Sequence, residues 1–180
     1  FSRLRTDAAT ATLARPAKGN RQDIAFGVGA KVGAIWDIDE RFSVGASFQS
    51  PVWFQEFKKY RDLLVGSLDT PWQAHAGGVW RVLPTTDVAL DLRYIGYSHV
   101  KVIGRTPAAG GFGWDDVKAV MIGAQHRIGS KWTARAGFSL ATSPIPKENI
   151  FANTFTAAVS QKAATGGIAY KLNHKTELSF

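Results

Sequence analysis

The sequence predicts an all-β fold: an antiparallel up-and-down transmembrane β-barrel, with about eight strands present in these 180 residues. Three observations lead to this prediction. Apolar and polar residues alternate in runs of about ten residues, very short turns join these runs in pairs, and aromatic residues gather beside the turns. Long loops separate the pairs, and short turns at one end with long loops at the other are typical of outer-membrane barrels.

The alternating runs form four pairs along the chain. Side chains of a strand point to opposite faces in turn, so each run should have one apolar and one polar face. The pairs occupy residues 24–36 with 41–50, 70–82 with 87–97, 117–128 with 131–142, and 161–172 with 175–180. Their turns are residues 37–40, 83–86, 129–130 and 173–174, and the loops cover roughly 51–69, 98–116 and 143–160.

The regularity of the alternation differs between the runs. In run 41–50 the apolar face carries Phe42, Val44 and Phe48, and in run 87–97 Asp91 and Arg93 lie opposite the aliphatic residues. Run 70–82 is mixed and run 161–172 is weaker, and each contains a glycine pair that would let the wall bend. The last run, 175–180, is short.

Aromatic residues on the apolar face decide between a membrane barrel and a soluble β-sandwich, which would also alternate. A sandwich core should concentrate large aromatics at mid-strand, where burial is deepest. Here they stand beside the short turns, at the depth where a membrane interface favours them. The residues are Trp36, Phe42, Trp80, Trp132 and Tyr170.

Composition and charge restrict the other possibilities. Cysteine is absent, and no apolar run is long enough for a transmembrane helix. The net charge is +8, but Lys and Arg are scattered rather than clustered, so we predict no nucleic-acid partner. Loop cations would instead meet outer-membrane lipid and lipopolysaccharide, or attract anionic substrates. Residues 1–23 carry no strand pattern and are predicted to be a loop or excursion before a partial barrel at 24–180.

The predicted interior contains the candidate polar contacts. Arg93 and Arg135 lie at mid-strand on the polar face, with Lys31, Gln73, His75, Asp91 and Gln125 on the same face. Two interpretations remain open. These groups satisfy one another across the lumen, or Arg93 or Arg135 binds a carboxylate head group through charge-assisted hydrogen bonds.

The long loops mix apolar residues with cations, which suits a hydrophobic molecule arriving from outside. The candidate contacts for its apolar chain are Phe54, Phe57, Leu63, Leu64 and Phe151. No enzyme is predicted, because the sequence lacks the motifs of nucleophilic catalysis. No metal or cofactor is predicted either, since the four histidines are far apart and the glycines of 27–33 lie within a strand.

Four segments, taken in order, resemble the long-chain fatty-acid and hydrocarbon transporter family of the Gram-negative outer membrane, the FadL/TodX type. They are SFQSPVWFQEFKKY at 47–60, DLRYIGYSHVK at 91–101, FGWDD at 112–116, and WTxRAG at 132–137 followed by SPIP at 143–146. The resemblance extends over about residues 24–180. Members of that family are monomeric barrels of about fourteen strands, plugged by an N-terminal hatch and open laterally to the bilayer.

The resemblance implies a passive outer-membrane channel for hydrophobic compounds such as long-chain fatty acids or aromatic hydrocarbons. It also implies that the chain is an internal or C-terminal-half fragment, without the hatch or the lateral gate. Two alternatives of other classes remain open. One is a small, complete eight-stranded outer-membrane barrel with a structural or adhesive role. The other is a soluble β-sandwich binding module.

Overall fold

The computed structural model of the chain describes residues 2–4, 23–58, 66–154, 160–173 and 176–180. Its main element is one antiparallel sheet of eight strands in the order β12-β11-β10-β9-β8-β7-β5-β4. The strands are β4 (Lys31–Asp37), β5 (Phe42–Gln49), β7 (Gln73–Leu83), β8 (Thr86–Ile95), β9 (Val117–Ile128), β10 (Trp132–Ala141), β11 (Lys162–Asn173) and β12 (Thr176–Ser179). Strands that are neighbours in the main sheet follow each other along the chain, so the up-and-down prediction is confirmed.

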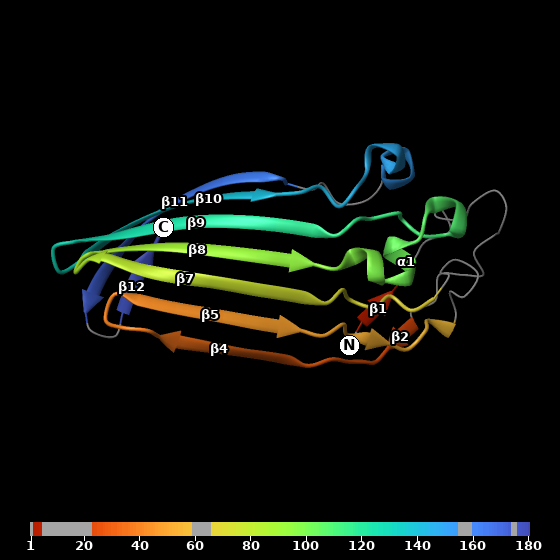
Figure 1. Ribbon diagram of the computed structural model, residues 1–180, viewed down its shortest axis with the longest axis horizontal. Helices are drawn as coiled ribbons and strands as arrows, with labels where there is room; N and C mark the ends of the chain where they lie inside the picture. Colours follow the sequence, from red (N-terminus) through yellow and green to blue (C-terminus); the bar gives the residue numbers. More distant parts are fainter. Residues whose placement is uncertain (1, 5–22, 59–65, 155–159, 174–175) are drawn as a thin grey trace.

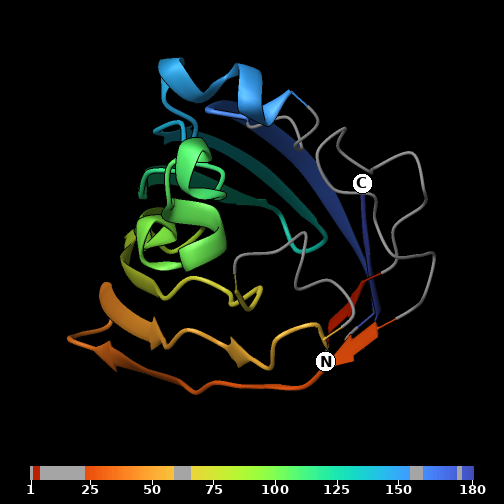
Figure 2. The ribbon, with the colours of Figure 1, turned by 90° about the vertical axis from the view of Figure 1, so that its right-hand side faces the viewer.

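The short turns all lie at one end of the sheet and the long connections at the other (Figure 1). Viewed along the strands, the sheet curls into an arc (Figure 2). Among the described residues β4 pairs only with β5, and β12 only with β11, so the arc is not closed. This single curled sheet differs from both alternatives, since a sandwich needs two packed sheets and a complete small barrel needs paired ends.

The two faces of the sheet follow residue parity. The register keeps odd-numbered residues opposite odd-numbered ones across all eight strands, as in Gln125↔Arg135 and Arg135↔Gly167, except after the bulges at Arg81 and Lys171. We call the odd-numbered side the polar face and the even-numbered side the apolar face. In β9 the even-numbered residues are exposed and the odd-numbered ones partly buried, which is the predicted alternation.

The first predicted strand, 24–36, is wrong as a single element. The structure divides it into β2 (Asp23–Ala25), β3 (Gly27–Val28) and β4, each in a different sheet. β2 pairs with β1 (Ser2–Leu4), and β3 pairs with β6 (Trp53–Phe54). The break has a steric cause. A Cβ at Gly27 would lie 2.5 Å from the Phe54 ring, so only glycine at this position lets Phe54 of β6 pack this close.

The long connections contain short helices that the sequence did not predict. Between β8 and β9 lie η3 (Tyr97–His99), α1 (Lys101–Gly104) and η4 (Pro107–Ala109). Between β10 and β11 lie η5 (Lys147–Asn149) and η6 (Phe151–Asn153). Within the described ranges, no helix is long and apolar enough to cross a membrane.

The chain has little conventional core. The few buried apolar side chains lie mostly at the loop end, where Phe57 packs with Ala25 against Phe54 and Leu68. Along the sheet, by contrast, the large residues of the apolar face are open: Leu90, Leu92 and Ile122 are about half exposed. An apolar surface of this extent needs a covering other than water.

Candidate functional site

The turn half of the polar face is a network of mutually satisfied groups. Three arginines there each have a carboxylate partner: Arg81 with Asp37 at 3.9 Å, Arg127 with Asp87 at 3.1 Å, and Arg135 with Glu177 at 3.3 Å. Gln125 links two of these pairs, since its amide donates to Asp87 over 2.8 Å and its oxygen accepts from Arg135 over 3.4 Å. This half matches the interpretation in which lumen groups satisfy one another.

The Arg135–Glu177 pair reaches across a whole strand. Arg135 lies on β10 and Glu177 on β12, with β11 between them. The β11 residue opposite Arg135 is Gly167, which has no side chain on the polar face. Glu177 is opposite Lys171, four residues further along β11, so the guanidinium crosses β11 diagonally, at the level of the small, buried Ala169.

The loop half of the polar face differs in its charge balance. Here Arg93 donates from Nε to Nε2 of His75 over 3.2 Å, a neutral acceptor. Neither Arg93 nor Lys31 makes an ion pair with a described residue. Asp91, an acidic residue, lies on the same face, and its charge acts on His75. Two permanent cations and one carboxylate leave this region positive.

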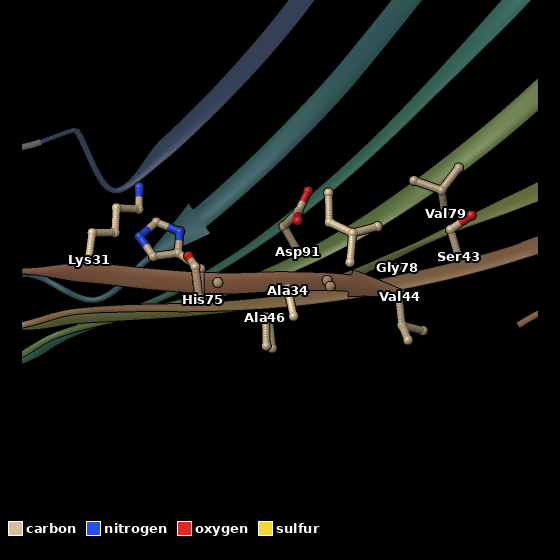
Figure 3. A pocket seen from close by; sticks show the side chains of 15 residues that line it. Lys31, Ala34, Ser43, Val44, Ala46, His75, Gly78, Val79 and Asp91 are labelled. Atoms are coloured by element: carbon tan, nitrogen blue, oxygen red, sulfur yellow. The ribbon is translucent and has the colours of Figure 1, made fainter. Parts of the chain in front are cut away.

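Lys31, but not Arg93, lines an open groove of about 660 Å³. Its polar rim comprises Lys31, His75 and Asp91, and its floor is made of small residues, among them Gly45 and Gly77. Figure 3 shows Lys31, His75 and Asp91 pointing to one side of the sheet and Val44 and Ala46 to the other. The groove therefore combines a lysine and an aspartate at its rim with room above an almost bare backbone.

A second groove of about 540 Å³ lies further along the polar face. Gly123, Gly137 and Thr165 line it, with Gln125 and Arg135 at its polar side. Of the two arginines predicted for a head group, Arg135 lines this second groove and Arg93 lines neither of the two. Arg135 already has a carboxylate partner, whereas Arg93 has only His75.

The loops at the far end are held together by buried amides. Trp114 donates from its indole to the side-chain oxygen of Asn153 over 2.7 Å, and Asn153 donates to the Phe112 and Asn149 carbonyls over 2.8 and 2.9 Å. Asn153 is buried, yet Phe151 in the same short helix is 93% exposed. The network therefore fixes a turn that presents an aromatic ring to the outside.

A carboxylate ties the first of these loops to the wall. Asp116 accepts from the Tyr94 hydroxyl over 2.6 Å and from the Ser98 amide over 2.9 Å. Burial acts to raise the pKa of the Asp116 carboxyl, but these hydrogen bonds outweigh it and hold that pKa below its usual value.

Two of the remaining predicted contacts, Phe54 and Phe57, pack together. Phe54 is partly buried and Phe57 is 2% exposed, so both take part in packing at the loop end. Leu63 and Leu64 lie outside the described residues. No group of three His, Cys, Asp or Glu side chains that could hold a metal occurs in the described part of the chain.

The apolar face carries two levels of aromatic residues. At the turn end Phe42 stacks on Trp80 at 5.8 Å between ring centroids, and Trp132 meets Tyr170 at 4.6 Å, as the turn positions predicted. At the loop end Trp72 stacks on Tyr94 at 4.9 Å and contacts Phe48 at 6.0 Å. The sequence placed Trp72 on the apolar face of run 70–82 but did not predict this upper level, because only the register brings Phe48 and Tyr94 from the neighbouring strands beside it.

The two aromatic levels stand at a membrane-like separation. Trp72 and Trp80 are eight residues apart in the sequence, or roughly 20 Å in height for a strand tilted by about 40°. Outer-membrane barrels show an apolar band of about 25 Å between two aromatic girdles. The apolar face therefore has the dimensions of a surface that contacts lipid.

Comparison with known proteins agrees with this geometry. Residues 7–180 match the family model described as outer membrane protein transport protein (OMPP1/FadL/TodX). No curated protein matches the chain.

Several solved structures share the fold at low sequence identity. The Ralstonia pickettii toluene transporter TbuX aligns with TM-score 0.61 and 16% identity over 88% of this chain and 42% of its own. The Pseudomonas putida toluene transporter TodX gives 0.63 and 16% over 86% and 43%. A Pseudomonas aeruginosa FadL homologue gives 0.56 and 14% over 84% and 41%. The chain spans less than half the length of these structures.

Proposed function

We propose that this chain, which belongs to the outer membrane protein transport protein family (OMPP1/FadL/TodX), forms part of the wall of a passive channel for hydrophobic compounds. The family places it in the outer membrane of a Gram-negative bacterium. It is a family of transport proteins, not of enzymes. The curled sheet is accordingly a portion of a transmembrane β-barrel, as the sequence predicted.

One observation supports the channel most directly: the wall is apolar outside and polar inside, and its polar face is hollowed by grooves with glycine floors. Small residues leave volume for a passing molecule, and the lipid-like exterior keeps the wall in the bilayer. The compounds that we propose are long-chain fatty acids or aromatic hydrocarbons, carried by a monomer in contact with outer-membrane lipid.

For a carboxylate head group, Arg93 is the better of the two predicted partners. Its present hydrogen bond goes to a neutral imidazole, while Arg135 would have to leave Glu177. Lys31 on the same face adds a positive charge, and the sequence did not single it out as a ligand. Phe151 is the exposed candidate for an initial apolar contact. The proposed contacts with the apolar chain also include Phe54, Phe57, Leu63 and Leu64, for which the structure describes no free surface.

The test uses the full-length protein that contains this chain, reconstituted in vesicles. We expect palmitate and toluene to enter vesicles that hold the protein faster than they enter protein-free vesicles. If both compounds enter the two kinds of vesicle at the same rate, a hydrophobic channel is refuted. Arg93→Gln should weaken palmitate binding by about ten- to a hundredfold, because it removes a charge-assisted hydrogen bond. Hexadecanol, which has the same chain length without a charge, should bind the variant as tightly as the wild type.

Arg135→Gln is the matched control. It removes an equal charge from the same face, but one already paired, so palmitate affinity should change by less than about threefold. If Arg135→Gln weakens palmitate as much as Arg93→Gln does, the assignment of the head group to Arg93 is wrong.

A further inference from the structure

Charged residues are almost absent from the apolar face of the main sheet. Across its eight described strands that face carries two charged side chains, both lysines: Lys118 and Lys162. Lys118 is the second residue of β9 and Lys162 the first residue of β11. Both therefore lie at the loop end of their strands (Figure 1). The two charges of this face thus share one sign and one end of the sheet.

Among the described residues neither lysine has a charged partner that would explain its position. Both side chains are exposed, and neither makes an ion pair with a described residue. Asp116, two residues before Lys118, is already engaged by Tyr94 and Ser98. An ammonium group facing lipid is costly unless its flexible stem carries it to the polar boundary of the bilayer.

The register places that boundary at the level of Lys118. Lys118 is directly opposite Tyr94, whose ring stacks on Trp72 in the upper aromatic level. Aromatic residues of this kind mark the interface between hydrocarbon and head groups. The ammonium groups therefore reach the head-group layer on the loop side, where lipid phosphates are the available anions.

The spacing of the two lysines matches two anionic groups on one lipid. β10 separates their strands, which gives about 10 Å across the sheet, and Lys118 lies one two-residue step, about 7 Å, further along it. Leu140 lies opposite Lys162 on one side and Val120 on the other. With Ile122 and Phe138, each about half exposed, these residues form an apolar strip that begins between the two cations.

We propose that Lys118 and Lys162 bind the two phosphates of one bisphosphorylated glycolipid of the outer leaflet, with its acyl chains on the strip of Val120, Leu140, Ile122 and Phe138. In a Gram-negative outer membrane this lipid is lipid A. The proposal rests on the proposed outer-membrane orientation, with the loops outward, but not on which compound the channel carries.

The test titrates lipid A into phosphatidylcholine nanodiscs that hold the full-length protein and counts the retained lipid by native mass spectrometry. We expect the wild type to retain one lipid A tightly. Lys118→Gln with Lys162→Gln should weaken it by about 25-fold, or about fivefold for each lysine. Monophosphorylated lipid A should bind the wild type more weakly by about the same factor as one single Lys→Gln replacement causes. The double variant with both lysines replaced by arginine should bind lipid A like the wild type.

Lys31→Gln is the matched control, because Lys31 also starts its strand at the loop end but lies on the polar face. It should leave lipid A retention unchanged. Should the double variant fail to fold, as judged by its heat-modifiable migration, the wild type still provides a test. Added salt must weaken lipid A retention, since exposed charge pairs are screened.

Three results would overturn the proposal: undiminished lipid A on the double variant, retention insensitive to salt, or phosphatidylglycerol competing as well as lipid A. Palmitate entry into vesicles is measured on the same variants. The double variant should transport like the wild type. A wild type that retains lipid A but carries no hydrophobic compound would refute the proposed channel and leave the lipid site standing.

Discussion

Replacing Asn153 by alanine should loosen the two outer loops, which then remain joined by the bonds of Asn149 to Gly113 and of Asp115 to Pro144. The side chain of Asn153 is 5% exposed and makes three short hydrogen bonds, from the Trp114 indole and to the Phe112 and Asn149 carbonyls. Each bond contributes about 1 kcal/mol net, and its loss leaves a partner group unsatisfied in a water-poor site. We expect local stability to fall by about 3 kcal/mol.

Native-state hydrogen exchange measures this loss directly, because it reports local opening separately from unfolding of the barrel. The amide of Asn153, which donates to Ile150, and that of Asn149, which donates to Pro146, are the reporters. A loss of about 3 kcal/mol corresponds to about a hundredfold drop in protection. Amides in the middle of the sheet should keep their protection.

Thr154→Ala is the adjacent control. Thr154 is exposed, and its hydroxyl donates to the Phe151 carbonyl within the same short helix over 2.7 Å. Its removal should cost less than about 0.5 kcal/mol, or about twofold in protection. If Asn153→Ala reduces protection no more than Thr154→Ala, the loops are not held by this side chain and the reasoning fails.

Two further predictions concern the wall and its first loop. Asp116 has a lowered pKa in the folded protein, so its contribution to loop closure is present above the unfolded pKa and lost as pH falls through the folded pKa. Hydrogen exchange of the Ser98 amide should therefore become faster below about pH 4. The variant Asp116→Asn should abolish this pH dependence. Gly77→Ala should destabilise the barrel by about 1–2 kcal/mol, because its Cβ would lie 2.1 Å from an Asp91 oxygen and 3.0 Å from the Leu90 carbonyl. Gly78 lies on the other face, and the nearest atom to its added Cβ would be 3.4 Å away, so Gly78→Ala should leave stability unchanged. Denaturant unfolding in detergent compares the stability of the two variants. Equal losses of stability would contradict the assigned faces.

Strand pattern and interior polarity could be predicted from the sequence because both depend on local alternation. Run 117–128 coincides with β9, and the polar face of run 87–97 carries Asp91 and Arg93 as expected. The break in run 24–36 could not be predicted in this way. It depends on the packing of Phe54 against Gly27, two residues that the alternation treats independently.

Whether each candidate arginine has a carboxylate partner also depends on long-range register. Sequence parity placed Arg93 and Arg135 on the same face and left both available for a head group. Only the strand order and register show that Glu177, two strands away, pairs with Arg135, whereas Arg93 meets His75. The loop helices depend likewise on distant contacts such as Trp114 with Asn153.

The central claim is that even-numbered residues of the sheet face lipid and odd-numbered ones face a water-filled interior. The chain contains no cysteine, so single cysteines can be introduced from Val120 to Ala124 in β9 and spin-labelled in the full-length protein. Accessibility to oxygen, which partitions into lipid, should peak at 120, 122 and 124. Accessibility to a water-soluble nickel complex should peak at 121 and 123. Equal access to the nickel complex at all five positions would contradict the claim.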